Sequence, residues 1–193
     1  MSGTEPSPRA IAKAQRKLMA ELVKGVTKTV HVPAEPTVVF GAICQAMSRR
    51  RNDRPINLTI REFPEEMGTI TGLWLDLKDQ DVIVIEKRLA PDHQAVVLGH
   101  ELWHMEAGHC GHDFGAATVA ARAALSDHVD WPELARHVAA RSHSHQADEV
   151  AAEGFGLLLG SRMTSLLATP GAPQLDDVAR RISAALGYSG QQG

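Results

Sequence analysis

The chain has 193 residues, 44% of them hydrophobic and only 4% aromatic, so it can bury one core built mainly from aliphatic side chains. Its formal net charge of −3 argues against nucleic-acid binding through bulk positive charge. Two cysteines without a CxxC pair, no apolar leader and no run of about 18 apolar residues argue against a disulfide scaffold and a transmembrane helix, so we expect a cytoplasmic protein.

The N-terminal residues are expected to form an appendage. Residues 1–8 are rich in Ser and Pro and are expected to be disordered, and a basic helix is predicted from Arg9 to about Val23. We therefore divide the chain into a disordered tip with a basic helical arm, residues 1–30, and a main domain, residues 31–193. The basic side of the arm is typical of a solvated surface; the alternative is a docking arm for a partner or an acidic surface.

The main domain is predicted to begin with a loop at 31–36 and a helix from Thr37 to about Arg50. The basic run at 49–55 is typical of a solvated helix end. The apolar face of this helix is predicted to consist of Val38, Val39, Ala42, Ile43, Ala46 and Met47.

Strands and the first long helix of the domain follow. A strand is expected within 56–63, and two more, Leu73–Leu77 and Val82–Glu86, are joined by a polar turn. The continuous apolar run of the third strand indicates that both of its faces are covered. Pro91 then opens a helix that stops near Gly108.

The remaining residues are predicted to be mainly helical. No assignment is made for 109–130, and helices are expected at 132–141, from Gln146 to about Leu167, and at 175–186. The chain therefore predicts an α+β fold: an about three-stranded, mostly antiparallel sheet, then a metal-motif helix, then a C-terminal helical bundle.

The metal motif is H-E-x-x-H, formed by His100, Glu101 and His104. Four residues along a helix turn a side chain by about 400°, so both imidazoles lie about 40° apart on one face and can bind one ion. Chance would produce about 0.03 such matches in a chain of this composition. A catalytic zinc site also needs a third protein ligand and one open position.

One arrangement places the third ligand ten residues after the first His, but Cys110 occupies that position. His109 comes one residue too early, and nine helical positions turn it about 180° away from His100. His143 and His145 precede a later helix and are competing suppliers. They and His109, His112 and His128 are also candidates for stabilising an oxyanion.

The other arrangement takes a Glu from that later helix. Glu149 and Glu153 lie one turn apart beside an apolar row predicted to include Val150, Ala151, Phe155 and Leu158. A carboxylate on such a face is costly unless it is paired or bound to a metal. The alternative for Glu149 is an exposed residue that interacts with the helix dipole.

These residues resemble the motifs of the ImmA/IrrE family of bacterial metallopeptidases, over about residues 35–165. The family combines a helical H-E-x-x-H with a later E-x-x-A-[Asn/Asp]-x-F, and this chain has Glu149, Ala152, Glu153 and Phe155 at the second motif. The resemblance implies that His100, His104 and Glu149 bind Zn²⁺ and that Glu101 is the catalytic carboxylate. Trp103 departs from the family pattern, which often has Gly there, and is expected to narrow the cleft beside the metal.

The resemblance also implies a small zincin-like (gluzincin-like) domain whose strand before the metal helix pairs with an extended substrate. We therefore expect a zinc-dependent endopeptidase that acts on a partner regulatory protein such as a helix-turn-helix repressor, with Glu153 or Asp148 orienting a ligand histidine. Direct binding of nucleic acid or membrane is not expected. The alternative is a non-catalytic metal-binding regulator, or a toxin–antitoxin component, that acts by binding its partner.

Overall fold

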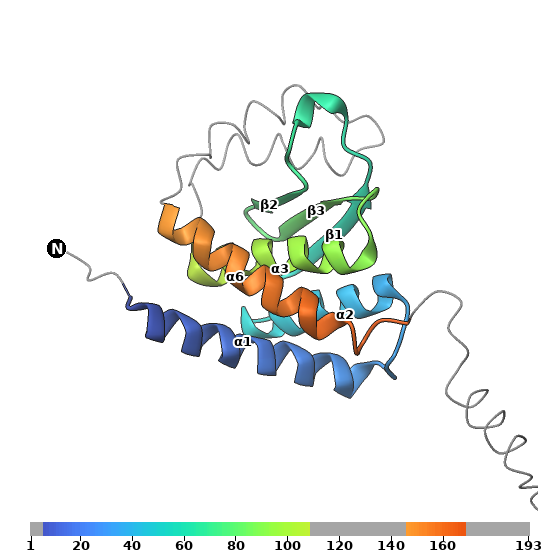
Figure 1. Cartoon of the computed structure of the whole chain (residues 1–193). Helices are drawn as coiled ribbons and strands as arrows, with labels where there is room; N and C mark the ends of the chain where they lie inside the picture. The colour runs from blue at the N-terminus through green and yellow to red at the C-terminus, as the bar shows by residue number, and fades with distance from the viewer. Residues whose placement is uncertain (1–5, 109–145, 169–193) are drawn as a thin grey trace, which may run out of the picture.

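The computed structural model describes residues 6–108 and 146–168 (Figure 1). The expected helices at 132–141 and 175–186 lie outside these residues. No helix within the described ranges is long and apolar enough to cross a membrane. In chain order, the elements are α1 (Pro8–Thr29), α2 (Pro36–Arg50), β1 (Ile56–Arg61), the 3-10 helix η1 (Glu65–Met67), β2 (Gly72–Asp76), β3 (Asp81–Glu86), α3 (Pro91–Ala107) and α6 (Gln146–Met163).

The α+β class is confirmed, but the prediction of a mostly antiparallel sheet is wrong. The strand order is β1-β3-β2; β2 pairs with β3 antiparallel, whereas β1 pairs with β3 parallel. The tight hairpin places β2 on one edge of β3, and the longer connection through η1 brings β1 to the other edge in the same direction as β3. The strand directly before α3 is therefore central, and the antiparallel edge strand is β2.

Both faces of β3 are covered, as its apolar sequence predicts. Ile83 and Ile85 belong to the main core, which the sheet shares with the four helices, whereas Val82 and Val84 pack on the opposite face with Phe63 and Met67. Every residue of β3 is buried. The sheet is thus fixed between a large helical layer and a small apolar cap.

Helix α1 is longer than predicted and shares the main core. Its side chains Leu18, Met19, Leu22 and Val26 are buried there, mainly against α2 and α6. Figure 1 shows α1 along the outside of the helical layer, away from the sheet. The domain division at residue 30 stays a prediction.

The predicted apolar face of α2 needs a correction. Val38 is 50% exposed, whereas Phe40 and Cys44, which lie outside the predicted face, are buried. The reason is that α2 packs against α1 on one side and against β1 and α3 on another, so its buried face is wider than one stripe. Burial raises the pKa of the Cys44 thiol to about 12, as expected for an inert core cysteine.

The basic run at 49–55 is more than a solvated helix end. Arg54 Nε lies 2.9 Å from Oδ2 of the buried Asp81, whose Oδ1 accepts a hydrogen bond from Trp74 Nε1 at 3.0 Å. Arg50 binds the carboxylates of Glu21 on α1 and Glu106 on α3. These arginines therefore connect the helices and close the β2–β3 hairpin.

Candidate metal centre

Helix α3 carries the first two residues of the centre. Pro91 stands at its start, where a missing N–H has no cost, and Gly108 ends it in the left-handed conformation with φ 73°. The helix is continuous between these ends, so His100 and His104 lie one turn apart on the same face, as their spacing predicts.

Helix α6 runs antiparallel to α3 and is held unusually close to it by glycines. A Cβ on Gly156 would lie 2.6 Å from the carbonyl oxygen of Val96, and one on Gly160 would lie 2.4 Å from a methyl group of Val96. On α3, a Cβ on Gly99 would lie 2.9 Å from the Cα of Gly156. Real side chains essentially never tolerate such distances, so this close approach requires glycine.

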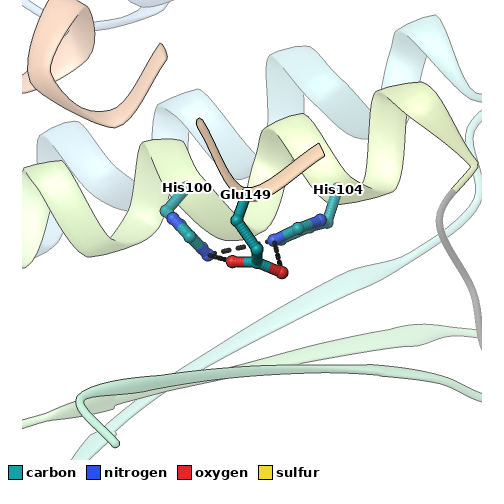
Figure 2. Close-up of side chains that lie close together, drawn as sticks. All are labelled: His100, His104 and Glu149. Carbon is teal, nitrogen blue, oxygen red and sulfur yellow. Dashed lines mark hydrogen bonds and ion pairs between the residues drawn. The ribbon is translucent and has the colours of Figure 1, made fainter. Parts of the chain in front are cut away.

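The close packing brings the start of α6 beside the two histidines. Glu149 Oε2 lies 3.5 Å from His100 Nε2, and Glu149 Oε1 lies 3.6 Å from His104 Nε2. The two Nε2 atoms are 3.0 Å apart. Figure 2 shows both imidazoles and the carboxylate converging on one point beside α3. The structure thus brings together the three residues that the sequence selected as ligands, from segments 45 positions apart.

These distances fit a metal ion. A tetrahedral zinc ion with Zn–N and Zn–O bonds of about 2.0–2.1 Å separates its ligand atoms by about 3.3 Å, close to the 3.0, 3.5 and 3.6 Å observed here. Two Nε2 lone pairs at 3.0 Å repel unless a proton or a cation lies between them. His100, His104 and Glu149 therefore form a group that could hold a metal ion.

Burial also suits the centre to metal binding. The side chains of His100, His104 and Glu149 are 26%, 13% and 41% exposed, so one side of the group remains open to solvent. Burial lowers the pKa of His100, and the negative charges of Glu149 and Glu153 oppose this shift in part. A lowered pKa favours the neutral imidazole, which is the form that binds metals.

Glu101 follows the first histidine and lies where α3 meets the start of the edge strand. A Cβ on Gly72 would lie 2.8 Å from Glu101 Oε1 and 2.3 Å from a methyl group of Val97. Gly72 therefore lets β2 approach the carboxylate closely. Glu101 is half-buried at this junction, on the helix that carries both histidines.

Two predictions about the surroundings of the centre are corrected. Trp103 does not narrow a cleft: it is buried, and its ring stacks at a tilt on Phe155 of α6, with centroids 5.5 Å apart. Val150 and Leu158 are 62% and 37% exposed. The row that continues from Glu149 and packs on α3 consists of Ala152, Phe155, Gly156, Leu159, Gly160 and Met163.

The other candidates lie further out or outside the described residues. Glu153 is exposed and Asp148 is half-buried, both on the first turns of α6. The glycines that set the α3–α6 distance were missed, although Gly156 and Gly160 form the small-x-x-x-small spacing typical of close helix packing. His109, Cys110, His112, His128, His143 and His145 lie outside the described residues.

Comparison of the chain with protein-family models, with curated proteins and with solved structures gave no match. Any functional conclusion must therefore come from the residues of the chain and their arrangement.

Proposed function

We propose that the chain is a zinc-dependent endopeptidase of the ImmA/IrrE type that acts on a partner regulatory protein, such as a helix-turn-helix repressor. The observation that carries the proposal is the convergence of His100, His104 and Glu149 on one point. Glu101 supports it, because it stands beside the first ligand at the junction with the edge strand.

This set of donors suits zinc better than it suits magnesium or calcium. Two imidazoles and one carboxylate make up the His₂Glu set of several zinc hydrolases, and magnesium and calcium prefer all-oxygen sites. The partly exposed centre leaves a side free for water and substrate. When bound, zinc would supply a Lewis acid that activates water near neutral pH and polarises a peptide carbonyl.

Glu101 would perform the proton transfers. Its carboxylate oxygen accepts a proton from the attacking water, and the same oxygen then delivers this proton to the nitrogen of the departing amine. Its position one residue after His100 turns it about 100° away from the ligand face, so it can serve as a base without being a ligand. General acid–base groups of this kind contribute about 10²–10⁴-fold to rate.

The substrate is expected to bind in an extended form along β2. Within residues 6–108 and 146–168, this strand pairs with β3 alone, and its first residue, Gly72, adjoins Glu101. An extended peptide can add to such an edge through main-chain hydrogen bonds. The strand that pairs with the substrate is thus expected to be β2 and not β3, because β1 and β2 occupy both edges of β3.

The proposal is tested with a pool of fluorogenic extended peptides and the zinc-loaded protein. We expect Glu101→Gln to retain one zinc ion per chain and to lose peptide cleavage by about 10²–10⁴-fold, because Gln keeps the shape but cannot accept the proton. The matched control is Glu62→Gln, an exposed carboxylate whose Oε1 lies 3.7 Å from Nζ of the exposed Lys87. It should cleave like the wild type.

Two outcomes would contradict the proposal. If Glu101→Gln cleaved peptides as fast as the wild type, Glu101 would not be the catalytic base. The second outcome is that the zinc-loaded wild type cleaves no peptide, while the wild type and Glu101→Gln bind a regulatory protein equally well. The non-catalytic regulator would then be the better account.

A further inference from the structure

Helix α1 exposes a row of basic side chains that neither the core nor the metal centre uses. Leu18, Met19, Leu22 and Val26 face inwards, and Gln15 Nε2 donates a hydrogen bond to the carbonyl oxygen of Ala151 on α6 at 2.8 Å. The opposite face is solvent-exposed. Its basic members, here called the basic stripe, are Arg9, Lys13, Arg16, Lys17, Lys24 and Lys28.

The basic stripe is narrow and straight. At about 100° per residue, its six positions fall within an arc of about 120°, roughly opposite the centre of the buried face. From Arg9 to Lys28 it extends over about 28 Å of helix at about 1.5 Å per residue. Arg49 of α2 extends the positive charge sideways, because one of its guanidinium nitrogens lies 3.4 Å from where a Cβ on Gly25 would stand.

Few carboxylates compensate this charge. Among the described residues, Lys17 alone of the six lies within 4.0 Å of a carboxylate, that of Glu21, and Glu21 also binds Arg50. Six cations and one carboxylate give α1 a formal charge of +5, so the rest of a chain with a net charge of −3 carries −8. The net charge of the chain therefore hides a strongly positive helix.

The composition of the exposed face indicates the kind of partner. A helix that inserts into the lipid needs a free apolar face, and the apolar face of α1 is buried in the core. Protein interfaces are enriched in aromatic residues and depleted of Lys, whereas the exposed positions of α1 are almost all Lys, Arg, Ala and Thr. A row of cations without apolar anchors is typical of contacts to a phosphate backbone.

We infer that the basic stripe of α1 binds the phosphate backbone of duplex nucleic acid, without reading its bases. The contacts are ion pairs from Lys and Arg to phosphate oxygens, so binding releases counterions and weakens steeply with salt. Such binding depends on local and not on net charge, and it does not involve the metal centre.

The test is the fluorescence anisotropy of a labelled duplex DNA of about 25 base pairs, titrated with full-length protein at several salt concentrations from about 50 mM upwards. The variant is Lys13→Gln/Arg16→Gln/Lys24→Gln. Gln favours helix and all three positions are exposed, so the fold should be kept. The matched control, Lys78→Gln/Lys87→Gln/Arg162→Gln, removes three exposed cations elsewhere. Equal urea midpoints for all three proteins show that each is folded.

We expect the wild type and the control to bind alike. The stripe variant should lose at least about tenfold in affinity at low salt, and its slope of log K against log salt should be shallower by about 2.7, three contacts at about 0.9 each. An unchanged slope in the stripe variant would overturn the inference, as would an equal loss in the control. Tighter, stripe-dependent binding to vesicles with anionic headgroups, or to poly-glutamate, would overturn it in favour of a lipid or protein partner.

Discussion

The α3–α6 contact and the attachment of α1 to the core are built in opposite ways. Helix α6 approaches α3 through Gly99, Gly156 and Gly160, where one added methyl group would meet backbone or a neighbouring side chain. Helix α1 is attached through large buried side chains such as Leu18 and Leu22. The first contact sets a distance between backbones and thereby the position of Glu149, whereas the second buries apolar area and thereby stabilises the fold.

The largest expected loss of stability comes from Leu22→Ala on α1. Leu22 is 1% exposed, and truncation of such a side chain removes packing and leaves a cavity that costs about 3 kcal/mol. Urea unfolding should show this loss, while zinc affinity in native buffer stays unchanged. A large loss of zinc affinity would contradict the separation of the two contacts.

Gly156→Ala tests the α3–α6 contact. Its new methyl group must displace the carbonyl of Val96 or the whole of α6, and such overpacking costs about 2 kcal/mol. Because the shift also moves Glu149 relative to the histidines, zinc affinity should fall by about 10–100-fold, the range found when the support of a metal ligand is disturbed. A chelator competition assay measures this, and wild-type affinity would mean that the glycine contact does not position Glu149.

The stability contributed by a third region, the Glu86–Arg88 pair, should depend on pH and not on either helix contact. Arg88, through its side-chain hydrogen bond, lowers the pKa of the buried Glu86 to about 2, with help from the backbone N–H groups of Arg88 and Phe63. The pKa of Glu86 in the folded chain is below its value of about 4.3 in the unfolded chain. The contribution of this carboxylate to stability is therefore present above pH ~4.3 and is lost as the pH falls towards 2.

Glu86→Gln should therefore lower the free energy of unfolding by about 1.5 kcal/mol at pH 7. This figure is reduced for screening by solvent, because the side chain of Arg88 is 62% exposed. The variant should also flatten the decline in unfolding free energy between pH ~4.3 and 2. Urea titrations at several pH values check both effects. An equally steep decline in the variant would assign the acid sensitivity to another carboxylate.

The smallest effect is expected from Gly154→Ala, the matched control for Gly156→Ala on the same helix. A Cβ there would meet only Gln15 Nε2, at 3.9 Å, and Gly154 is exposed. Since Ala is the better helix former, this variant should be more stable by about 0.5–1 kcal/mol, with unchanged zinc affinity. A fall in zinc affinity at Gly154 would show that any change in α6 disturbs the centre.

Short-range patterns predicted most of the elements and the ligand pair. The spacing of His100 and His104 is a property of one helix, and the apolar run of β3 indicates burial on both faces, so both follow from local sequence. The choice of Glu149 needed the resemblance as well as the position of a carboxylate beside an apolar row. Its contact with both histidines is a tertiary fact that local sequence does not contain.

The errors came from contacts that sequence periodicity does not describe. The parallel pairing of β1 depends on which edge of β3 the hairpin leaves free. The expectation that Trp103 narrows a cleft rests on the resemblance, because the family often has Gly at this position, but the place of Trp103 on the helix turns it towards Phe155. The arginines at 50 and 54 looked like a solvated run because their partners, Glu106 and Asp81, are distant in sequence.

The most direct test of the central claim is zinc affinity measured by chelator competition for the wild type, Glu149→Ala and Glu153→Ala. The two glutamates lie one turn apart on α6, but Glu149 alone contacts both histidines in the structure, whereas Glu153 is exposed. The account predicts one zinc ion per wild-type chain, a loss of more than about 100-fold for Glu149→Ala and wild-type affinity for Glu153→Ala. Wild-type affinity in Glu149→Ala would contradict it.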